Sequence, residues 1–329
     1  MANTGGIAIF WAIVAPMAVA LAGAWLLGGD TLSNWTSPLA DHIDGLKART
    51  PAALALIGVL AVLHVTGWID DRRGLSAAAK LLVQLIVALV LAGPLQIRAM
   101  QFLENYGTLG LGASILISVF WIVAITNAMN MMDNMDGLAG GVGLIITGFY
   151  LAATLIAGQW FIAALCALLG GALVGFLVFN RPPARLFMGD KGSLVIGMLL
   201  AVISIRTTYY VSPQANGMTL PAISTSASWY ATLMPLVIVA VPLYDLVSVC
   251  LIRLSHGRSP FVADRNHLSH RLVRRGMSQP AAVSLILLLT IITAMGGIMF
   301  ATLTAWQAIL VATQTALILT VLALLEFTG

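Results

Sequence analysis

Long, continuous apolar segments constrain the fold of this chain more than any other feature of its sequence. Only α-helices and closed β-barrels satisfy all of their backbone hydrogen bonds within a bilayer. Barrel strands alternate apolar and polar residues, whereas the apolar segments here are continuous and long enough for helices to cross a membrane. Of the 329 residues, 60% are hydrophobic and 9% are charged, against about a quarter charged in soluble domains. The sequence therefore predicts an all-α, polytopic membrane protein.

We expect a transmembrane helical bundle of about ten helices that forms a single domain over residues 1–329. Within it, residues 253–279 form a loop rich in His and Arg. Pro235 and Pro242 are expected to bend the eighth membrane helix. The ten expected segments are about 6–27, 51–68, 79–96, 110–126, 138–157, 160–178, 193–210, 229–251, 280–301 and 304–326.

Basic residues are unevenly distributed between the two sides of this predicted bundle. If successive segments cross in alternate directions, the loops after the even-numbered segments share one side and hold twelve of the sixteen Lys and Arg. By the positive-inside rule that side is cytoplasmic, and both chain termini lie there as well. The twelve are Arg72, Arg73, Lys80, Arg181, Arg185, Lys191, Arg253, Arg258, Arg265, Arg271, Arg274 and Arg275.

The loops on the opposite side contain few ionisable groups, and we interpret them as spacers. They cover residues 28–50, 97–109, 158–159 and 211–228. Within the first of them, residues 41–49 fit a loop better than a short interfacial helix with Ile43 and Leu46 toward the lipid.

The stretch NAMNMMDNMDG, which begins at Asn127, places three amides and two carboxylates at the end of an apolar segment. Polar groups at that depth are costly unless they serve a cavity or a ligand. A regular helix would align Asn127, Asn130 and Asn134 but turn Asp136 to the opposite side. The polar groups can therefore face one cleft only if the helix ends inside the motif.

We expect that helix to end within residues 131–134. Gly137 then supplies a permissive turn before the next helix. The alternative is that these groups only cap the helix end and contact solvent. Capping alone does not require five polar side chains.

Two adjacent carboxylates, Asp70 and Asp71, follow the second membrane segment. They can bind one divalent cation together, or divide the roles of base and ligand. The alternative is a solvated loop in which the two following arginines are counter-ions. On the next helix Lys80 and Gln84 share a face. Lys80 can either extend to the membrane interface or reach a phosphate.

A Gly-Asp turn, FMGDKGS, precedes the seventh membrane segment. Its glycines allow backbone amides to approach a ligand, and Ser193 is the expected N-cap of the helix. A helix N-terminus favours phosphate, and Asp190 is a suitable ligand for a hard cation. An ordinary turn is the alternative.

The last polar candidates are Asp245 on the eighth segment and the loop that follows it. An acid near a bent helix end in a membrane is a site candidate, with a structural ion pair to Arg253 as the alternative. His267, His270 and Arg271 lie close together in the loop and predict an anion site for pyrophosphate or a lipid headgroup. A transition-metal site at the two histidines is the less favoured alternative.

Together these motifs resemble the polyprenyl-phosphate N-acetylhexosamine-1-phosphate transferases, over residues 5–271. Four motifs occur in the order found in that family. They are IDD…GLS…K…Q at 69–84, NAMNMMDNMDGLAGG at 127–141, LFMGDKGS at 186–193, and VPLYDLVSVCLIR…SPFVADRNHLSHRL at 241–272.

The sequence departs from the family pattern in two places. The family loop usually reads HLHH, whereas Ser269 stands at its third position here, so only His267 and His270 are carried over. The family also begins with a further membrane helix and a Pro-Arg-x-Gly-Gly segment, of which residues 4–10 look like the end. Either the first helix is absent, or the start codon has been placed too late.

The resemblance implies transfer of an N-acetylhexosamine 1-phosphate, expected to be GlcNAc-1-phosphate, from a UDP-sugar to polyprenyl (undecaprenyl) phosphate with release of UMP. This reaction begins synthesis of a cell-envelope glycan such as a cell-wall polymer, lipopolysaccharide or teichoic acid. The implied location is the bacterial inner membrane, with the active site facing the cytoplasm. The implied cofactor is Mg²⁺, with Mn²⁺ as the alternative.

The resemblance also assigns roles to residues. Asp70, Asp71 and Asp190 are the expected catalytic residues, with Asp70 as the base for the lipid phosphate. The expected metal ligands are Asp190 and one of the Asp70/Asp71 pair, assisted by Asn130. The expected substrate-binding residues are Lys80, Asn127, Asn130, Asp133, Asp136, Asp245, His267, His270 and Arg271.

Three other functions remain open at this point, and one of them is a binding or scaffolding protein that has lost activity, given Ser269. A phospho-MurNAc-pentapeptide transferase would carry a His-His-His-Phe-Glu run, which this sequence lacks, and HLSHRL looks more like the N-acetylglucosamine branch. A transporter of nucleotide sugars or lipids would carry polar groups through the depth of the membrane. Expected partners are the UDP-N-acetylhexosamine, polyprenyl phosphate and membrane lipid, with no nucleic acid. A homodimer is left open.

Overall fold

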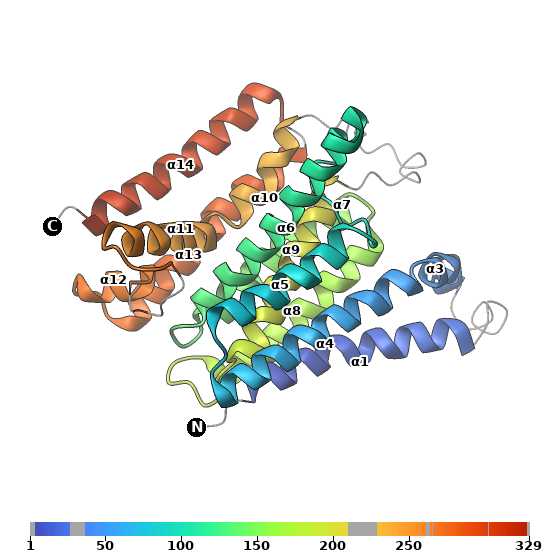
Figure 1. The fold of residues 1–329 in the computed structure, drawn as a ribbon, viewed down its shortest axis with the longest axis horizontal. Helices are drawn as coiled ribbons and strands as arrows, with labels where there is room; N and C mark the ends of the chain where they lie inside the picture. Colours follow the sequence, from blue (N-terminus) through green and yellow to red (C-terminus); the bar gives the residue numbers. More distant parts are fainter. Residues whose placement is uncertain are drawn as a thin grey trace.

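The computed structural model describes residues 4–26, 37–209, 229–260, 264, 266–301 and 303–327. Regular structure in this part is helical, and most of the long helices lie roughly side by side (Figure 1). The first half comprises α1 (Gly5–Leu26), α3 (Ser37–Ala48), α4 (Thr50–Arg73), α5 (Ala77–Ala92), a 3-10 helix η1 (Gln101–Tyr106), α6 (Gly107–Met132) and α7 (Leu138–Ile156). The second comprises α8 (Trp160–Asn180), α9 (Asp190–Tyr209), η3 (Trp229–Thr232), α10 (Leu233–Ile238), α11 (Ala240–Ser255), α12 (Leu268–Arg274), α13 (Gln279–Ile298), η4 (Met299–Ala301) and α14 (Ala305–Phe327).

Each predicted membrane segment coincides with a helix or a pair of helices. In the described part of the chain, seven helices are long and apolar enough to cross a membrane: α1, α4, η1 with α6, α7, α8, α13 and α14. Helix α5 is apolar but shorter. Helix α9 and the pair α10 and α11 occupy the other two predicted segments. The predicted polytopic helical bundle is confirmed.

The eighth predicted helix is broken between α10 and α11, at Val239. Pro242 has no backbone N–H, so it cannot bond to the carbonyl of Ile238, four residues earlier and the last residue of α10. The predicted bend is therefore present, with a proline as its physical cause.

Two predicted spacers contain helices. Residues 37–48 form α3, so the loop interpretation of residues 41–49 was wrong, and Ile43 is buried against the protein. Residues 101–106 form η1, next to an ion pair between Arg98 and Glu104 at 2.8 Å. The predicted spacer 211–228 lies outside the described residues.

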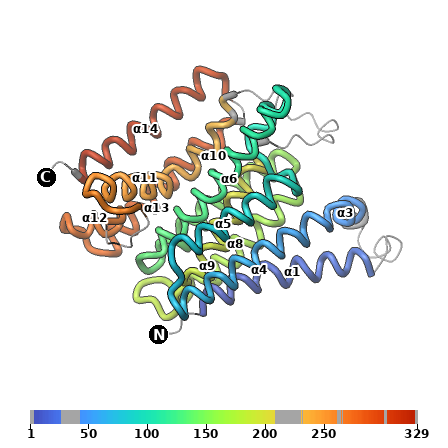
Figure 2. The backbone as a smooth tube through the Cα atoms, viewed as in Figure 1, coloured from blue at the N-terminus to red at the C-terminus, as the bar shows by residue number. Residues whose placement is uncertain are grey.

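Helix α9 forms the centre of the bundle. Every residue from Lys191 to Ile205 is buried, as expected of a helix that is apolar on all sides. It packs against α1, α4, α6 and α7, whose paths can be followed in Figure 2. On α4, a Cβ added to Gly67 would overlap the backbone of Lys191, so the two helices approach as closely as glycine allows. This packing fixes the first turn of α9 against the last turns of α4.

Both described ends of the chain lie at the same end of the bundle. The amides of Gly5 and Gly6 donate to the carbonyls of Phe187 and Met188, just before α9. Glu326, near the end of α14, pairs with Arg271 of α12. Figure 1 shows both termini away from α3, which lies at the opposite end. The first and last described helices therefore each have one end beside the polar loops.

Candidate active site

A lysine between two aspartates forms the centre of the polar end. Lys80, in the first turn of α5, places its Nζ 2.8 Å from Oδ2 of Asp70 and 2.9 Å from Oδ2 of Asp190. The second oxygen of Asp70 accepts the amide of Leu75 at 2.6 Å. Thus the ends of α4, α5 and α9 bring together three charged groups that sequence analysis had singled out separately.

Asn130 extends this cluster from α6. Its Nδ2 donates to Oδ1 of Asp190 at 3.0 Å and to Oγ of Ser193 at 2.8 Å. Helix α9 begins at Asp190, so the prediction that Ser193 is its N-cap was wrong. Ser193 instead lies in the first turn, where its hydroxyl donates to the carbonyl of Gly189 at 3.2 Å.

Asp71 points away from its neighbour Asp70. Its Oδ1 accepts the backbone amide of Asp190 at 3.1 Å, and its Oδ2 lies 2.9 Å from Nζ of Lys191. Successive residues of a helix are rotated by about 100°, so the two adjacent carboxylates diverge. Asp71 accepts from the first amide of α9, where a negative charge is stabilised. The structure therefore gives the two aspartates different surroundings.

Helix α6 ends inside the polar motif that begins at Asn127, as predicted. The last helical residue is Met132, and Gly137 has a φ of 76° at the start of α7. In the turn, Oδ2 of Asp133 accepts the amide of Gly189 at 3.1 Å. Burial, with the nearby charge of Asp190, raises the pKa of Asp133 to about 6. Asp133 thus lies beside the cluster of Lys80, Asp70 and Asp190.

The other polar residues of this motif contact different parts of the protein. Asp136 accepts the amide of Ala184 at 2.9 Å, in the loop between α8 and α9. Asn127 donates to the side chain of Gln84 on α5 and to the carbonyl of Val123. These contacts link neighbouring elements and do not include the aspartates around Lys80.

Asp245 organises a second cluster, at the start of α12. This fully buried carboxylate accepts the amide of Leu268 at 2.6 Å and lies 3.0 Å from Nδ1 of His267. The alternative pairing of Asp245 with Arg253 does not occur. Arg253 instead forms a bidentate ion pair with Asp264, with N–O distances of 3.0 and 3.1 Å. This ion pair lowers the pKa of Asp264 to about 2.

Arg271 lies inside the protein and is not part of an open anion site. Its guanidinium donates to Glu326 at 3.0 Å and Ser248 at 2.8 Å, and also to the carbonyl of Asn266. Only 6% of the residue is exposed. The rings of His267 and His270 lie 6.5 Å apart and tilted. The predicted His/Arg-rich loop is therefore a folded segment with its own buried charge network.

The two clusters are joined through Ser269. Its hydroxyl donates to Oδ1 of Asn134 at 2.5 Å, and the residue is almost fully buried. Asn134 also donates to the carbonyl of Met131 at 2.7 Å. A serine where the family motif has histidine thus connects α12 to the turn after α6.

Sequence reasoning missed two charged residues of this region. Lys191 follows Asp190 directly, but only the packing of α9 on α4 brings it to Asp71. Glu326 is the one acidic residue within the sequence of α14. An isolated acid in an apolar helix marks a functional or paired group, so this signal was present in the sequence.

An all-helical membrane bundle with its aspartates, amides and basic residues gathered at one end has the architecture of a membrane-embedded enzyme that handles charged substrates. Residues 53–208 match the family described as Glycosyl transferase family 4. A decaprenyl-phosphate N-acetylglucosaminephosphotransferase of Mycobacterium tuberculosis is 33% identical over 309 residues, covering 89% of this chain and 70% of the relative. The chain therefore belongs to Glycosyl transferase family 4, a family of integral membrane phosphoglycosyl transferases.

Two further relatives carry similar names. A probable undecaprenyl-phosphate N-acetylglucosaminyl 1-phosphate transferase of Bacillus subtilis is 29% identical, over 81% of this chain and 71% of the relative. An undecaprenyl-phosphate alpha-N-acetylglucosaminyl 1-phosphate transferase of Escherichia coli is 29% identical, over 76% of this chain and 66% of the relative. The family resemblance read from the four motifs is confirmed.

Proposed function

We propose that this protein transfers GlcNAc-1-phosphate from UDP-GlcNAc to a polyprenyl phosphate, such as undecaprenyl phosphate, and releases UMP. The observation that carries the proposal is the convergence of Asp70, Lys80, Asp190 and Asn130 at one end of a membrane bundle. The names of the relatives support this donor and acceptor. They do not favour a MurNAc-pentapeptide transferase or a transporter.

The chemistry is a phosphoryl transfer. An oxygen of the lipid phosphate forms a bond to the β-phosphorus of the donor, while the bond from that phosphorus to the bridging oxygen breaks and UMP leaves. Catalysis of such transfers consists mostly of positioning and charge neutralisation. Because a phosphate monoester has its second pKa near 6, most of the nucleophile is already dianionic at neutral pH. A base such as Asp70 then contributes less than groups that neutralise the diphosphate.

The residues around Lys80 suit a hard divalent cation. Two carboxylates, of Asp70 and Asp190, already converge within 2.9 Å of one positive charge, the ammonium of Lys80. Among the described residues no three His, Cys, Asp or Glu side chains are arranged to hold a metal ion together. Mg²⁺ commonly takes only one or two protein carboxylates and completes its shell with phosphate oxygens and water. The donor set therefore fits Mg²⁺, and also Mn²⁺, with the diphosphate as a further ligand.

When bound, the metal would neutralise charge on the donor diphosphate. The carboxylates of Asp190 and Asp70 and the side-chain oxygen of Asn130 would hold it. Asp71, which accepts the first amide of α9, would keep Asp190 in place. Lys80, when it exchanges a carboxylate partner for a phosphate oxygen, would hold a substrate phosphate in position.

The remaining candidates divide according to their contacts. Asp133 lies beside Asp190 and is proposed to contact the donor or a metal-bound water. His267 and His270, at the start of α12, are proposed to contact the sugar or its phosphate. Asn127, Asp136 and Arg271 bond to protein groups and are proposed to shape the site. Asp245 orients His267.

The side of the membrane follows from charge. The site lies at the end of the bundle that carries Arg72, Arg73, Arg181 and Arg185, whereas α3 lies at the opposite end. By the positive-inside rule this end is proposed to face the cytoplasm. In a bacterium, the membrane is then the inner membrane, where cytoplasmic UDP-sugars have access to the site.

A groove beside the broken helix is proposed for the prenyl chain. Helices α10 and α11 form one wall and α14 the other, around a volume of about 640 Å³. Its lining is almost wholly apolar and includes Leu236, Leu243 and Val247. Toward the polar end it includes Tyr244 and Ser248, which contact Glu326 and Arg271. Such a groove suits an isoprenoid whose phosphate extends toward the polar end.

Filling this groove should weaken use of the lipid substrate alone. Ala316→Trp places a large ring in the groove between α11 and α14, so the KM for undecaprenyl phosphate should rise about tenfold. The KM for UDP-GlcNAc should not change. Leu317→Trp is the matched control, because Leu317 is the next residue and lines the separate groove between α13 and α14. Equal effects of the two substitutions on the lipid KM would contradict the assignment of the groove.

The function itself is tested by an assay on the purified, full chain. Protein in detergent is supplied with UDP-GlcNAc, undecaprenyl phosphate and Mg²⁺, and we expect stoichiometric formation of UMP and lipid-linked GlcNAc diphosphate. UDP-MurNAc-pentapeptide in place of UDP-GlcNAc should give far less UMP. Uptake of labelled UDP-GlcNAc into proteoliposomes without UMP formation would instead support a transporter.

A further inference from the structure

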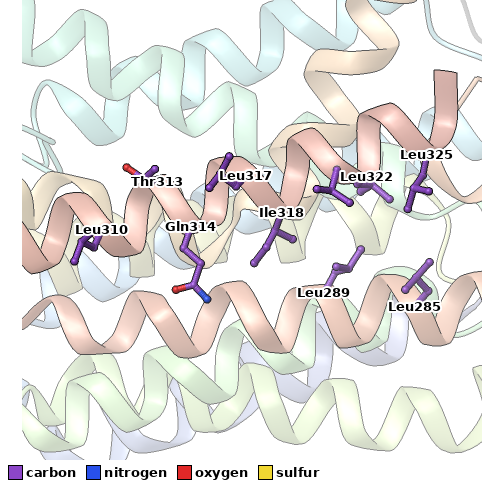
Figure 3. Close-up of a pocket in the computed structure, with 10 residues that line it drawn as sticks. Leu285, Leu289, Leu310, Thr313, Gln314, Leu317, Ile318, Leu322 and Leu325 are labelled. Carbon is purple, nitrogen blue, oxygen red and sulfur yellow. The ribbon is translucent and has the colours of Figure 1, made fainter. Parts of the chain in front are cut away.

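Helix α14 is packed loosely along most of its length. An apolar groove of about 680 Å³ separates it from α13, as Figure 3 shows for Leu285 and Leu289 on one side and Ile318 on the other. The groove beside α11 separates its other face from the bundle. Only 17% of its most apolar stretch is buried. Apolar packing therefore does little to fix α14 in place.

The end of α14, in contrast, is held by a dense set of polar contacts. Oε2 of Glu326 accepts from Nε of Arg271 at 3.0 Å and from the hydroxyl of Tyr244 at 2.9 Å, and it lies 2.9 Å from Nη2 of Arg271. Arg275 donates to the backbone carbonyl of Glu326. The residue is 5% exposed. Charge-assisted bonds between buried groups are strong and directional, so this contact has one preferred geometry.

Arg271 extends this contact to the proposed site. The same guanidinium donates to Ser248 on α11 and to the carbonyl of Asn266, the residue before His267. Its Nη1 lies 4.0 Å from Asp245, which binds the ring of His267 and the amide of Leu268. The first turn of α12 is thus held from two sides, by Arg271 and by Asp245.

We propose that Glu326 is a positioning residue, which orients Arg271 and thereby fixes His267 and Ser269 at the site. This inference rests on the proposed function for its activity readout. Glu326 contacts none of the groups around Lys80, so it acts through Arg271 and α12. Without its carboxylate the buried guanidinium loses its close counter-charge, and only Asp245 remains, at 4.0 Å. The guanidinium must then turn toward Asp245, another acceptor or water. The carbonyl of Asn266 and the start of α12 are then released.

The test compares Glu326→Gln with Leu322→Ala. The first removes the charge but keeps the shape, whereas the second removes a buried apolar side chain one turn earlier on α14. Glu326→Gln should lower kcat/KM for UDP-GlcNAc about 100-fold, because small misplacements of positioning groups have effects of that size. Leu322→Ala should lower the melting temperature at least as much but lose little activity. Glu326→Asp, which keeps the charge, should recover part of the loss.

A second measurement does not depend on turnover. Amide hydrogen exchange over residues 266–274 should become faster in Glu326→Gln and stay at the wild-type rate in Leu322→Ala. If exchange is unchanged in Glu326→Gln, or if activity in the two variants falls in proportion to stability, Glu326 has no positioning role. If the wild type itself releases no UMP, the proposed function fails, while the exchange data still decide whether Glu326 holds α12.

Discussion

Asp190→Asn is expected to lower kcat/KM for UMP release about 1,000-fold. The substitution keeps the size of the side chain, and the amide can still bond to Asn130. It removes the negative charge that balances Lys80 at 2.9 Å and that would bind the cation. Removing one preorganised electrostatic group costs about 100- to 1,000-fold in rate, and a metal ligand belongs at the upper end of that range.

The measurement is UMP release over a range of Mg²⁺ concentrations. If Asp190 is a ligand, high Mg²⁺ should recover part of the lost rate. Asp44→Asn is the matched control, because Asp44 is an exposed acid of α3 at the opposite end of the bundle. Wild-type rates in Asp190→Asn would show that the metal assignment is wrong, even if the reaction itself is correct.

Lys80→Met is expected to slow the reaction and, at the same time, to lower its Mg²⁺ requirement. The maximal rate should fall about 100-fold, because a positive group that would hold a substrate phosphate is lost. The Mg²⁺ concentration that gives half-maximal rate should also fall. Without the ammonium, the carboxylates of Asp70 and Asp190 repel each other and both are available to a cation.

A titration of UMP release with Mg²⁺ measures both effects in one experiment. Arg73→Met is the control, since it removes an exposed positive charge of the same face without touching these carboxylates. A higher Mg²⁺ requirement in Lys80→Met would mean that Lys80 supports the cation site and does not compete with it.

The features that could be predicted from sequence are those set within a few neighbouring residues. The membrane segments follow from continuous hydropathy, and the break before Ala240 follows from the absent N–H of Pro242. The end of α6 at Met132 follows from polar groups that one regular helix cannot aim at one cleft. These properties depend on the local chain and on the bilayer.

The pairing of charges could not be predicted in the same way. As metal ligands, Asp70 and Asp71 were equivalent candidates in the sequence, yet one binds Lys80 and the other binds the first turn of α9. An ion pair of Asp245 with Arg253 was the alternative in the sequence, but Arg253 pairs with Asp264. The partner of a charged group is decided by which helix ends meet and how each helix is rotated.

The sequence by itself determined the helical membrane bundle, the face that carries the polar motifs and the family resemblance, because hydropathy and short motifs are local properties of the chain. Only the tertiary structure decided that Lys80 lies between Asp70 and Asp190, residues 120 positions apart, and that Glu326 holds Arg271. The physical reason is close packing around α9. Contacts such as Gly67 against Lys191 fix the rotation of each helix and its position along its axis. The rotation and axial position together determine which polar side chains meet.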